Sequence, residues 1–210
     1  NSIYNAPIIP SIFFKYQVNK NNGIRFSYSR GFRAPSLKEL YYYFVDINHN
    51  IQGNPNLNAE SSNNFQLALR TEYEKGKCRF IWSNQFYFND LSNLITLAQI
   101  TSTEYGYVNM QRSQNYGFNS NLNFSRKNFI VDAGITVKGR RSQFETEGPF
   151  SNGSFYTEFK INPSYHFAKA NTTLNIFYKF TGNMPNFIID AEGVISENRR
   201  DEYNMLDFTA

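Results

Sequence analysis

Apolar and polar residues alternate along most of the chain. In residues 65–74, the apolar residues Phe65, Leu67 and Leu69 occupy odd-numbered positions, and the polar residues Gln66 and Arg70 occupy even-numbered positions. A period of two is that of a β-strand with one apolar and one polar face. With a first strand over 9–18 and a last one starting near Tyr203, the pattern predicts nine strands. The others lie at 24–29, 65–74, 79–89, 116–125, 129–138, 158–167 and 173–181.

The connections between these strands alternate in length. Short polar turns are expected at 19–23, 74–77, 126–128 and 168–171, whereas long links such as 35–63 and 182–202 separate the hairpins. Short turns at one end and long loops at the other are typical of an outer-membrane barrel, whose apolar face meets lipid and whose polar face lines the lumen. The predicted fold class is all-β, an antiparallel up-and-down transmembrane β-barrel. Bacterial single-chain barrels have even strand numbers, so about nine strands indicate a portion of a larger barrel.

The long link after the second strand begins with a distinct local pattern. Pro35 cannot donate to a ladder and is expected to end the strand. Ser36 and Glu39 have the spacing of a capping box, which predicts one short helix over 37–42. A turn-rich segment, 53–60, leads into the next strand. We expect Arg33 and Glu60 to face each other across the base of this loop.

Composition and charge narrow the function classes. Aromatic residues make up 18% of the 210 residues, yet the mean hydropathy is −0.54. The longest apolar run, 40–45, is far too short for a transmembrane helix. One cysteine, Cys78, and two histidines, His49 and His166, exclude an internal disulfide and a zinc site built from these residue types. A net charge of +4 without a basic run gives only weak support for a nucleic-acid or anionic-lipid partner, and no nucleic-acid partner is expected.

An enzyme and a soluble binding module are the two function classes that compete with the barrel. An enzyme is not supported, because G-x-S-x-G, H-E-x-x-H and phosphate-loop patterns are absent from the sequence. A soluble β-sheet module that binds carbohydrate would concentrate its aromatic residues on one sheet. Here every predicted strand carries them, so the soluble module is the alternative to the barrel rather than the preferred interpretation.

Two segments of the first long link resemble a known family. Residues 32–41 and 53–57, followed by Glu60, are similar to the paired boxes of TonB-dependent outer-membrane receptors, and the resemblance extends to 87–90 and 203–207. It implies a plugged barrel of about 22 strands in the outer membrane of a Gram-negative bacterium. The residues that carry the boxes, to which we assign a structural role, are Phe32, Arg33, Ala34, Pro35, Asn54, Pro55, Asn56, Leu57 and Glu60.

The resemblance also implies partners outside this chain. Family members import scarce ligands with energy from the TonB complex, which they contact through an amino-terminal part that precedes the barrel. We expect a signal sequence, a plug and a terminal strand to belong to the same receptor. Residues 1–210 are then a single barrel portion with long extracellular loops, in contact with outer-membrane lipid.

The ligand implied is a metal chelate, with haem favoured, a ferric siderophore next and cobalamin as the alternative. Haem receptors of this family carry a histidine between the two boxes, where His49 lies, and a neutral imidazole can ligate haem iron. Tyr41, Tyr42 and Tyr43 can stack on a flat ligand. The alternatives are a loop histidine hydrogen-bonded to its polar neighbours and tyrosines that pack the loop or form an aromatic girdle. No intrinsic cofactor is expected, and His49 is a metal ligand only if haem binds.

Overall fold

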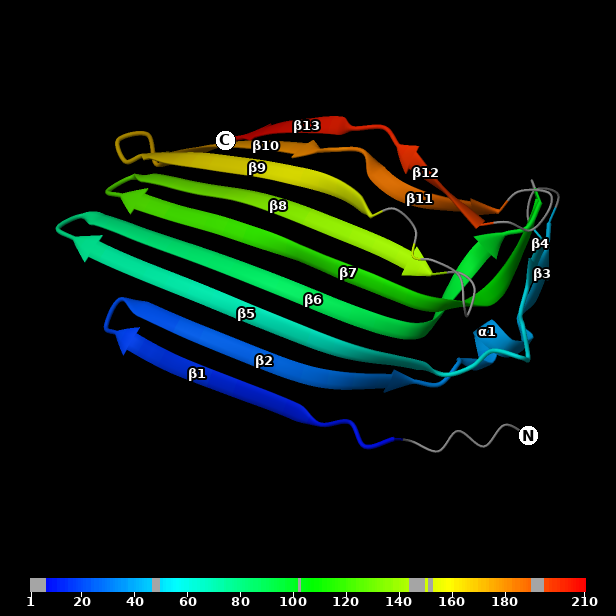
Figure 1. Ribbon diagram of the computed structural model, residues 1–210. Helices are drawn as coiled ribbons and strands as arrows, with labels where there is room; N and C mark the ends of the chain where they lie inside the picture. Colours follow the sequence, from blue (N-terminus) through cyan, green and yellow to red (C-terminus); the bar gives the residue numbers. More distant parts are fainter. Residues whose placement is uncertain (1–6, 47–49, 102, 144–149, 151–152, 190–194) are drawn as a thin grey trace.

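The computed structural model describes residues 7–46, 50–101, 103–143, 150, 153–189 and 195–210. Nine antiparallel strands lie side by side in chain order (Figure 1), which confirms the predicted up-and-down sheet. They are β1 (Ser11–Asn19), β2 (Asn22–Arg33), β5 (Glu60–Lys75), β6 (Cys78–Gln99), β7 (Glu104–Arg126), β8 (Phe129–Gln143), β9 (Ser154–Phe167), β10 (Thr172–Thr181) and β13 (Tyr203–Thr209).

The hairpins sort by end as expected. The connections β1–β2, β5–β6, β7–β8 and β9–β10 are tight and lie together at one end of the sheet, here called the turn end (Figure 1). Gly76, Lys127 and Asn171 adopt positive φ angles of 61°, 51° and 49° in three of these turns. Glycine and asparagine tolerate this conformation readily, which explains why polar turn residues recur there. The opposite end carries the long connections and is called the loop end.

The structure extends the strands beyond the predicted ranges. β6 and β7 continue to pair from Ser92↔Arg112 to Gln99↔Tyr105, where the alternation is lost. Polar residues occupy both faces near Asp90 and Gln114, so hydrogen bonding persists without a hydrophobic period. The loop end also holds α1 and four short strands. Their bounds are α1 (Leu37–Tyr41), β3 (Tyr43–Val45), β4 (Asn50–Gln52), β11 (Met184–Ile189) and β12 (Ile195–Arg200).

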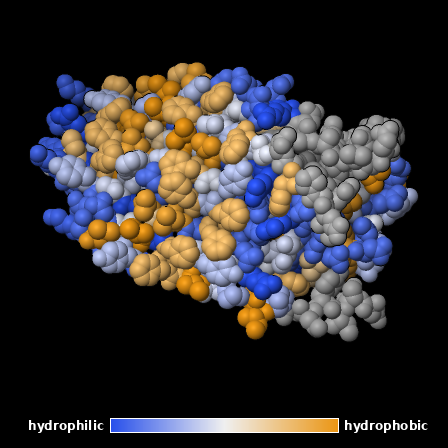
Figure 2. All heavy atoms as spheres, in the orientation of Figure 1, coloured by the Kyte–Doolittle hydropathy of each residue, from blue (hydrophilic) through white to orange (hydrophobic). Residues whose placement is uncertain are grey.

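One face of the sheet is apolar and exposed. Cross-strand partners Phe26↔Leu67, Leu67↔Phe86 and Phe86↔Phe118 continue one apolar row over four strands. Phe86 is 46% exposed, and Figure 2 shows apolar side chains gathered over the strands between the turn end and the loops. Among the described hydrophobic residues only Leu57, Ile95 and Met110 are buried. This face therefore lacks the packed second layer that a soluble sandwich requires, and it is suited to lipid.

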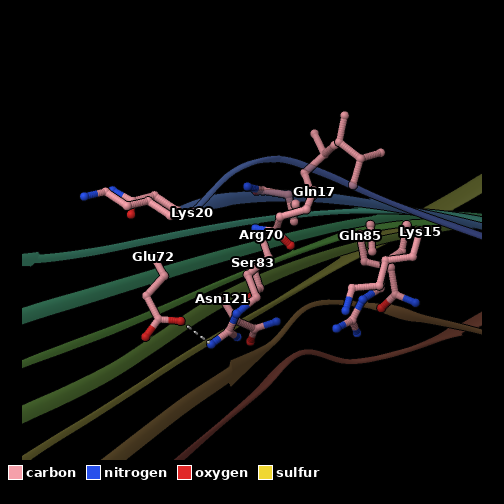
Figure 3. A pocket seen from close by; sticks show the side chains of 15 residues that line it. Lys15, Gln17, Lys20, Arg70, Glu72, Ser83, Gln85 and Asn121 are labelled. Atoms are coloured by element: carbon pink, nitrogen blue, oxygen red, sulfur yellow. Dashed lines mark hydrogen bonds and ion pairs between the residues drawn. The ribbon is translucent and has the colours of Figure 1, made fainter.

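The other face is polar. A row that includes Lys15, Arg25 and Gln85 crosses it near the turn end, where a cleft of about 360 Å³ opens between β1, β2, β5 and β6. Arg70 Nη2 donates to Glu72 Oε2 at 3.1 Å in this cleft (Figure 3). Within the described ranges, no helix is long and apolar enough to span a membrane. This polar face corresponds to the lumen-facing wall that the alternating pattern predicts.

The sheet is open in the described residues, because β1 and β13 each pair along one side only. Both edge strands expose large apolar side chains, including Phe14 at 56% and Phe208 at 64%. An unpaired edge is a template for further strands. The open sheet agrees with the prediction that these strands are part of a larger barrel.

A glycine fixes the packing of aromatic rings on the apolar face. A Cβ placed on Gly139 would lie 2.7 Å from the Phe155 ring and closer still to the Tyr116 ring. These two rings contact each other edge to face, with their centroids 5.6 Å apart. Replacing Gly139 with alanine in the full receptor is expected to lower the free energy of unfolding by about 1–3 kcal/mol, since both rings must move. Urea unfolding of the receptor in detergent measures this change in the free energy of unfolding. In a Tyr116→Ala background the loss should be smaller, because only the Phe155 ring still has to move. An equal loss in both backgrounds would contradict the packing argument.

Candidate functional site

The loop between β2 and β5 begins with a capped helix. Ser36 Oγ accepts a hydrogen bond from the Glu39 backbone N–H at 3.3 Å, and the Ser36 N–H donates to Glu39 Oε2 at 2.7 Å. This is the predicted capping box, and it starts α1 at Leu37. The helix ends at Tyr41, one residue before the predicted end. β2 ends at Arg33, two residues before Pro35, which is buried.

Arg33 joins three elements at the loop base. Its Nε and Nη2 donate to the two oxygens of Glu60, each at 2.7 Å, and its Nη1 donates to Glu39 Oε2 at 2.8 Å and Oε1 at 2.9 Å. Glu60 Oε1 also accepts from the Ile95 backbone N–H at 2.6 Å. The predicted Arg33–Glu60 pair is confirmed. Glu39 is the second partner, and sequence reasoning had assigned it to the capping box alone. We call Arg33, Glu39 and Glu60 the arginine clamp.

The clamp changes the acidity of its members. Hydrogen bonds from Arg33 lower the pKa of Glu39 to about 2, against the opposing effect of partial burial. The carboxyl groups of Glu60 and Glu39 in turn raise the pKa of Arg33. Glu39 and Arg33 are therefore charged throughout the physiological pH range.

This acidity gives the clamp a defined pH dependence. Because the pKa of Glu39 falls from 4.5 to about 2, its stabilisation is fully present above about pH 4.5 and is lost as the pH drops toward 2. Hydrogen exchange of the α1 amides should be slower in the parent receptor than in Glu39→Gln at pH 5–7. The difference should narrow below pH 4.5 and vanish near pH 2. A difference that persists unchanged to pH 2 would contradict the role of the Glu39 charge.

The second box, residues 53–57, packs against α1. A Cβ on Gly53 would lie 2.7 Å from the backbone of Leu40 and Tyr41, so only glycine fits. Asn54 donates its backbone N–H to Glu39 O at 2.8 Å and its side-chain Nδ2 to Tyr107 O at 3.0 Å. Asn54 is an anchor between the helix and β7.

The remaining residues of that box divide by exposure. Leu57 is 2% exposed and is one of the few buried apolar side chains in the described residues. Pro55 and Asn56 are exposed, and the Asn56 N–H donates to Asn54 Oδ1 at 3.0 Å.

The loop is also tied to the long β6–β7 hairpin. β3 pairs with β4, and β4 pairs in parallel with β7 from Asn50↔Glu104 to Gln52↔Gly106. Asn109 Oδ1 accepts from the Asn58 N–H at 2.7 Å, and Asn109 Nδ2 donates to Asn58 O at 3.1 Å. Sequence analysis missed Asn109, because a lone polar residue carries no periodic signal.

The three predicted tyrosines have different environments. Tyr41 and Tyr43 are 69% and 71% exposed, whereas Tyr42 is partly buried. The Tyr42 ring stacks on Phe44 with centroids 6.2 Å apart, and Lys38 Nζ lies 5.0 Å from its centroid. Tyr41 and Tyr43 thus present free aromatic surface, while Tyr42 packs the loop.

The two histidines lie at unrelated places in the chain. His49 lies outside the described residues, between β3 and β4 in sequence. His166 is at the turn end of β9, where its Nδ1 is 3.0 Å from Thr173 Oγ1. No group of three or more His, Cys, Asp or Glu suited to a metal ion occurs among the residues that the structure describes.

Comparisons with known proteins agree with this geometry. A family model described as "TonB dependent receptor-like, beta-barrel" matches residues 3–210. No curated protein sequence matches the chain. The FrpB iron transporter from Neisseria meningitidis is similar in structure, with a TM-score of 0.68, 14% identity and coverage of 95% of this chain and 30% of that one.

Two further solved structures show the same fold. The siderophore receptor PirA from Acinetobacter baumannii has a TM-score of 0.62 at 13% identity, over 94% of this chain and 33% of that one. The pyoverdine outer membrane receptor FpvA from Pseudomonas aeruginosa PAO1, bound to pyoverdine, has a TM-score of 0.60 at 16% identity, over 95% and 28%. The chain therefore spans about a third or less of the length of these proteins.

Proposed function

Because the chain belongs to the β-barrel family of TonB-dependent receptors, we propose that it forms part of the wall and outer mouth of a receptor that captures and imports a ferric chelate. The family consists of outer-membrane receptors and transporters of Gram-negative bacteria and not of enzymes. We further propose that residues 1–210 act as one barrel portion and that import by the whole receptor depends on the TonB complex.

The observation that carries the capture role is the pair of exposed tyrosines on a fixed loop. Tyr41 ends α1, which the arginine clamp holds, and Tyr43 begins β3, which pairs with β4. Aromatic rings held in place lose little freedom on binding, so they offer stacking surface to a flat or aromatic chelate at low entropic cost. This supports Tyr41 and Tyr43 as ligand contacts and assigns Tyr42 to loop packing.

A ferric siderophore is the ligand class that we favour. The structural relatives named above are described as an iron transporter, a siderophore receptor and a pyoverdine receptor. Haem is the second candidate, because His49 lies between the two boxes and imidazole is a common axial ligand. The two candidates differ in chemistry, since haem needs an axial side-chain ligand and a siderophore already saturates its iron.

Titration of the full-length receptor in detergent separates the candidates. Ferric pyoverdine and a ferric catecholate siderophore are followed by quenching of protein fluorescence, and haem is followed at the Soret band. Saturable binding of a ferric siderophore, unaffected by His49→Ala, supports the favoured class. Saturable haem binding that His49→Ala weakens supports the second. Failure of all three probes to bind would overturn the proposal of an iron chelate.

A further inference from the structure

Two cations face each other on the polar face of the sheet, near the turn end. Lys15 on β1 is the direct cross-strand partner of Arg25 on β2, and both side chains are exposed and line the cleft between β1, β2, β5 and β6. Like charges placed directly opposite each other on neighbouring strands are destabilising. A negative charge beside both groups would reverse that effect. We call Lys15 and Arg25 the cation pair.

The strands beside the cation pair supply no such charge. Arg25 pairs on its other side with Ala68 of β5, and the next residue in the same row is Gln85 of β6. Neither Lys15 nor Arg25 makes an ion pair or a hydrogen bond with a residue that the structure describes. Both cations therefore keep their full bonding capacity for a group that enters the cleft.

The carboxylate at the other end of the cleft already has partners. Glu72 is the one acidic residue among the described residues that line this cleft, and it accepts from Arg70 Nη2 at 3.1 Å and from Arg79 Nε at 2.9 Å. It lies four residues along β5 from the position opposite Arg25, which is about 14 Å at strand spacing. Figure 3 shows Glu72 and Lys15 at opposite ends of the cleft. Glu72 therefore does not neutralise the cation pair.

A second like-charged pair on the same face has a carboxylate beside it. Lys160 on β9 and Lys179 on β10 are cross-strand partners, and Lys179 Nζ lies 4.0 Å from Glu158 Oε1. The other oxygen of Glu158 accepts a hydrogen bond from Lys138 Nζ at 3.1 Å. The wall thus neutralises this pair with an acid of its own, whereas the cation pair of β1 and β2 keeps its charge.

We propose that the cation pair is a carboxylate-binding site in the barrel lumen. A guanidinium offers parallel N–H donors to a carboxylate and an ammonium adds a point charge, so the two side chains together suit one carboxylate. The cleft of about 360 Å³ beside them has room for the group that carries it. Two sources present this chemistry inside a receptor: an acidic side chain of the plug, and a carboxylate of the chelate during import. The inference rests on the lumen that the proposed receptor provides.

The first experiment is carbodiimide cross-linking of the full-length receptor in detergent, followed by peptide mass spectrometry. The reagent joins an amine and a carboxylate that touch each other as an amide and takes up the water released, so the product identifies the partner of Lys15. If the plug supplies the carboxylate, Lys15 cross-links to a plug residue. Arg25→Gln should then lower the yield about fivefold, the effect of one exposed ion pair. Lys127→Gln is the control, because Lys127 is an exposed lysine in the β7–β8 turn, outside the cleft.

The second experiment offers a free carboxylate to the same site. The rate at which an amine-reactive reagent acetylates Lys15 is measured with and without millimolar citrate, at constant ionic strength. If the site takes the carboxylate of a chelate, citrate slows the acetylation of Lys15 and not that of Lys127 in the same sample. Arg25→Gln should raise the citrate concentration needed for this protection about fivefold.

The two experiments together decide the inference. A cross-link to the plug, protection by citrate, or both support the site, and the first two results separately identify its source. A cross-link from Lys15 only to a carboxylate of another barrel strand overturns it, since the wall would then neutralise this pair as well. Absence of both the cross-link and the protection also overturns it. Neither measurement uses an iron chelate, so a negative result here is distinct from failure of the chelate titration that tests the proposed function.

Discussion

Replacing Arg33 with alanine is expected to release the loop between β2 and β5. The substitution removes hydrogen bonds to Glu60 and Glu39 and leaves two carboxylates, each with a side chain 14% exposed, without their cation. Charged hydrogen bonds of this kind contribute up to about 3 kcal/mol, and the 44% exposure of Arg33 reduces that value through solvent screening. We expect the local opening free energy to fall by about 2 kcal/mol, or about 30-fold faster exchange.

Hydrogen exchange of the amides in α1 and in residues 53–57 measures this effect. Arg25→Ala is the matched control, because Arg25 is an exposed arginine on the same strand without an ion pair among the described residues. The exchange of strands β8 and β9, which do not pair with this loop, should be unaffected in both variants. Equal exchange of the loop in Arg33→Ala and in the parent would show that the clamp does not hold the loop.

Replacing both Tyr41 and Tyr43 with serine is expected to weaken binding of the ferric chelate about 30-fold. Each ring stacked on an aromatic or flat ligand contributes roughly 1 kcal/mol beyond the area that it buries. Both side chains are exposed, and the substitutions leave the clamp and the capping box in place. The unfolding transition and membrane insertion should therefore match those of the parent receptor.

The titration that identifies the ligand also measures this loss. Tyr73→Ser provides the control, because Tyr73 is an exposed tyrosine, 51% accessible, at the turn end of β5. It should bind the chelate with parent affinity. An unchanged affinity in the Tyr41→Ser and Tyr43→Ser double variant would exclude these rings from the ligand site.

The strand pattern could be predicted because lipid and water impose it on opposite faces. Phe65, Leu67 and Leu69 alternate with polar residues only while one face meets lipid. Beyond Asp90 that constraint ends, so the extended pairing of β6 and β7 left no periodic signal. The same reason explains why β11 and β12 were not predicted. Both lie within the long link predicted after the eighth strand.

The loop base was predictable where local chemistry determines it. The capping box depends on two residues three apart, and the Arg33–Glu60 pair depends on the register of adjacent strands. The contacts of Asn54 with Tyr107 and of Asn58 with Asn109 join segments about 50 residues apart. Such contacts depend on how the loop folds back onto a hairpin, which no local pattern encodes.

The parallel pairing of β4 with β7 divides the loop between β2 and β5 into two shorter closed segments. The entropy of closing a loop grows only logarithmically with its length, at about 0.6 kcal/mol for each doubling. Residues inserted between β3 and β4 would therefore add little to the cost of closing that segment. The connection between β3 and β4 can therefore vary in length and sequence while the arginine clamp and the β4–β7 pairing stay the same.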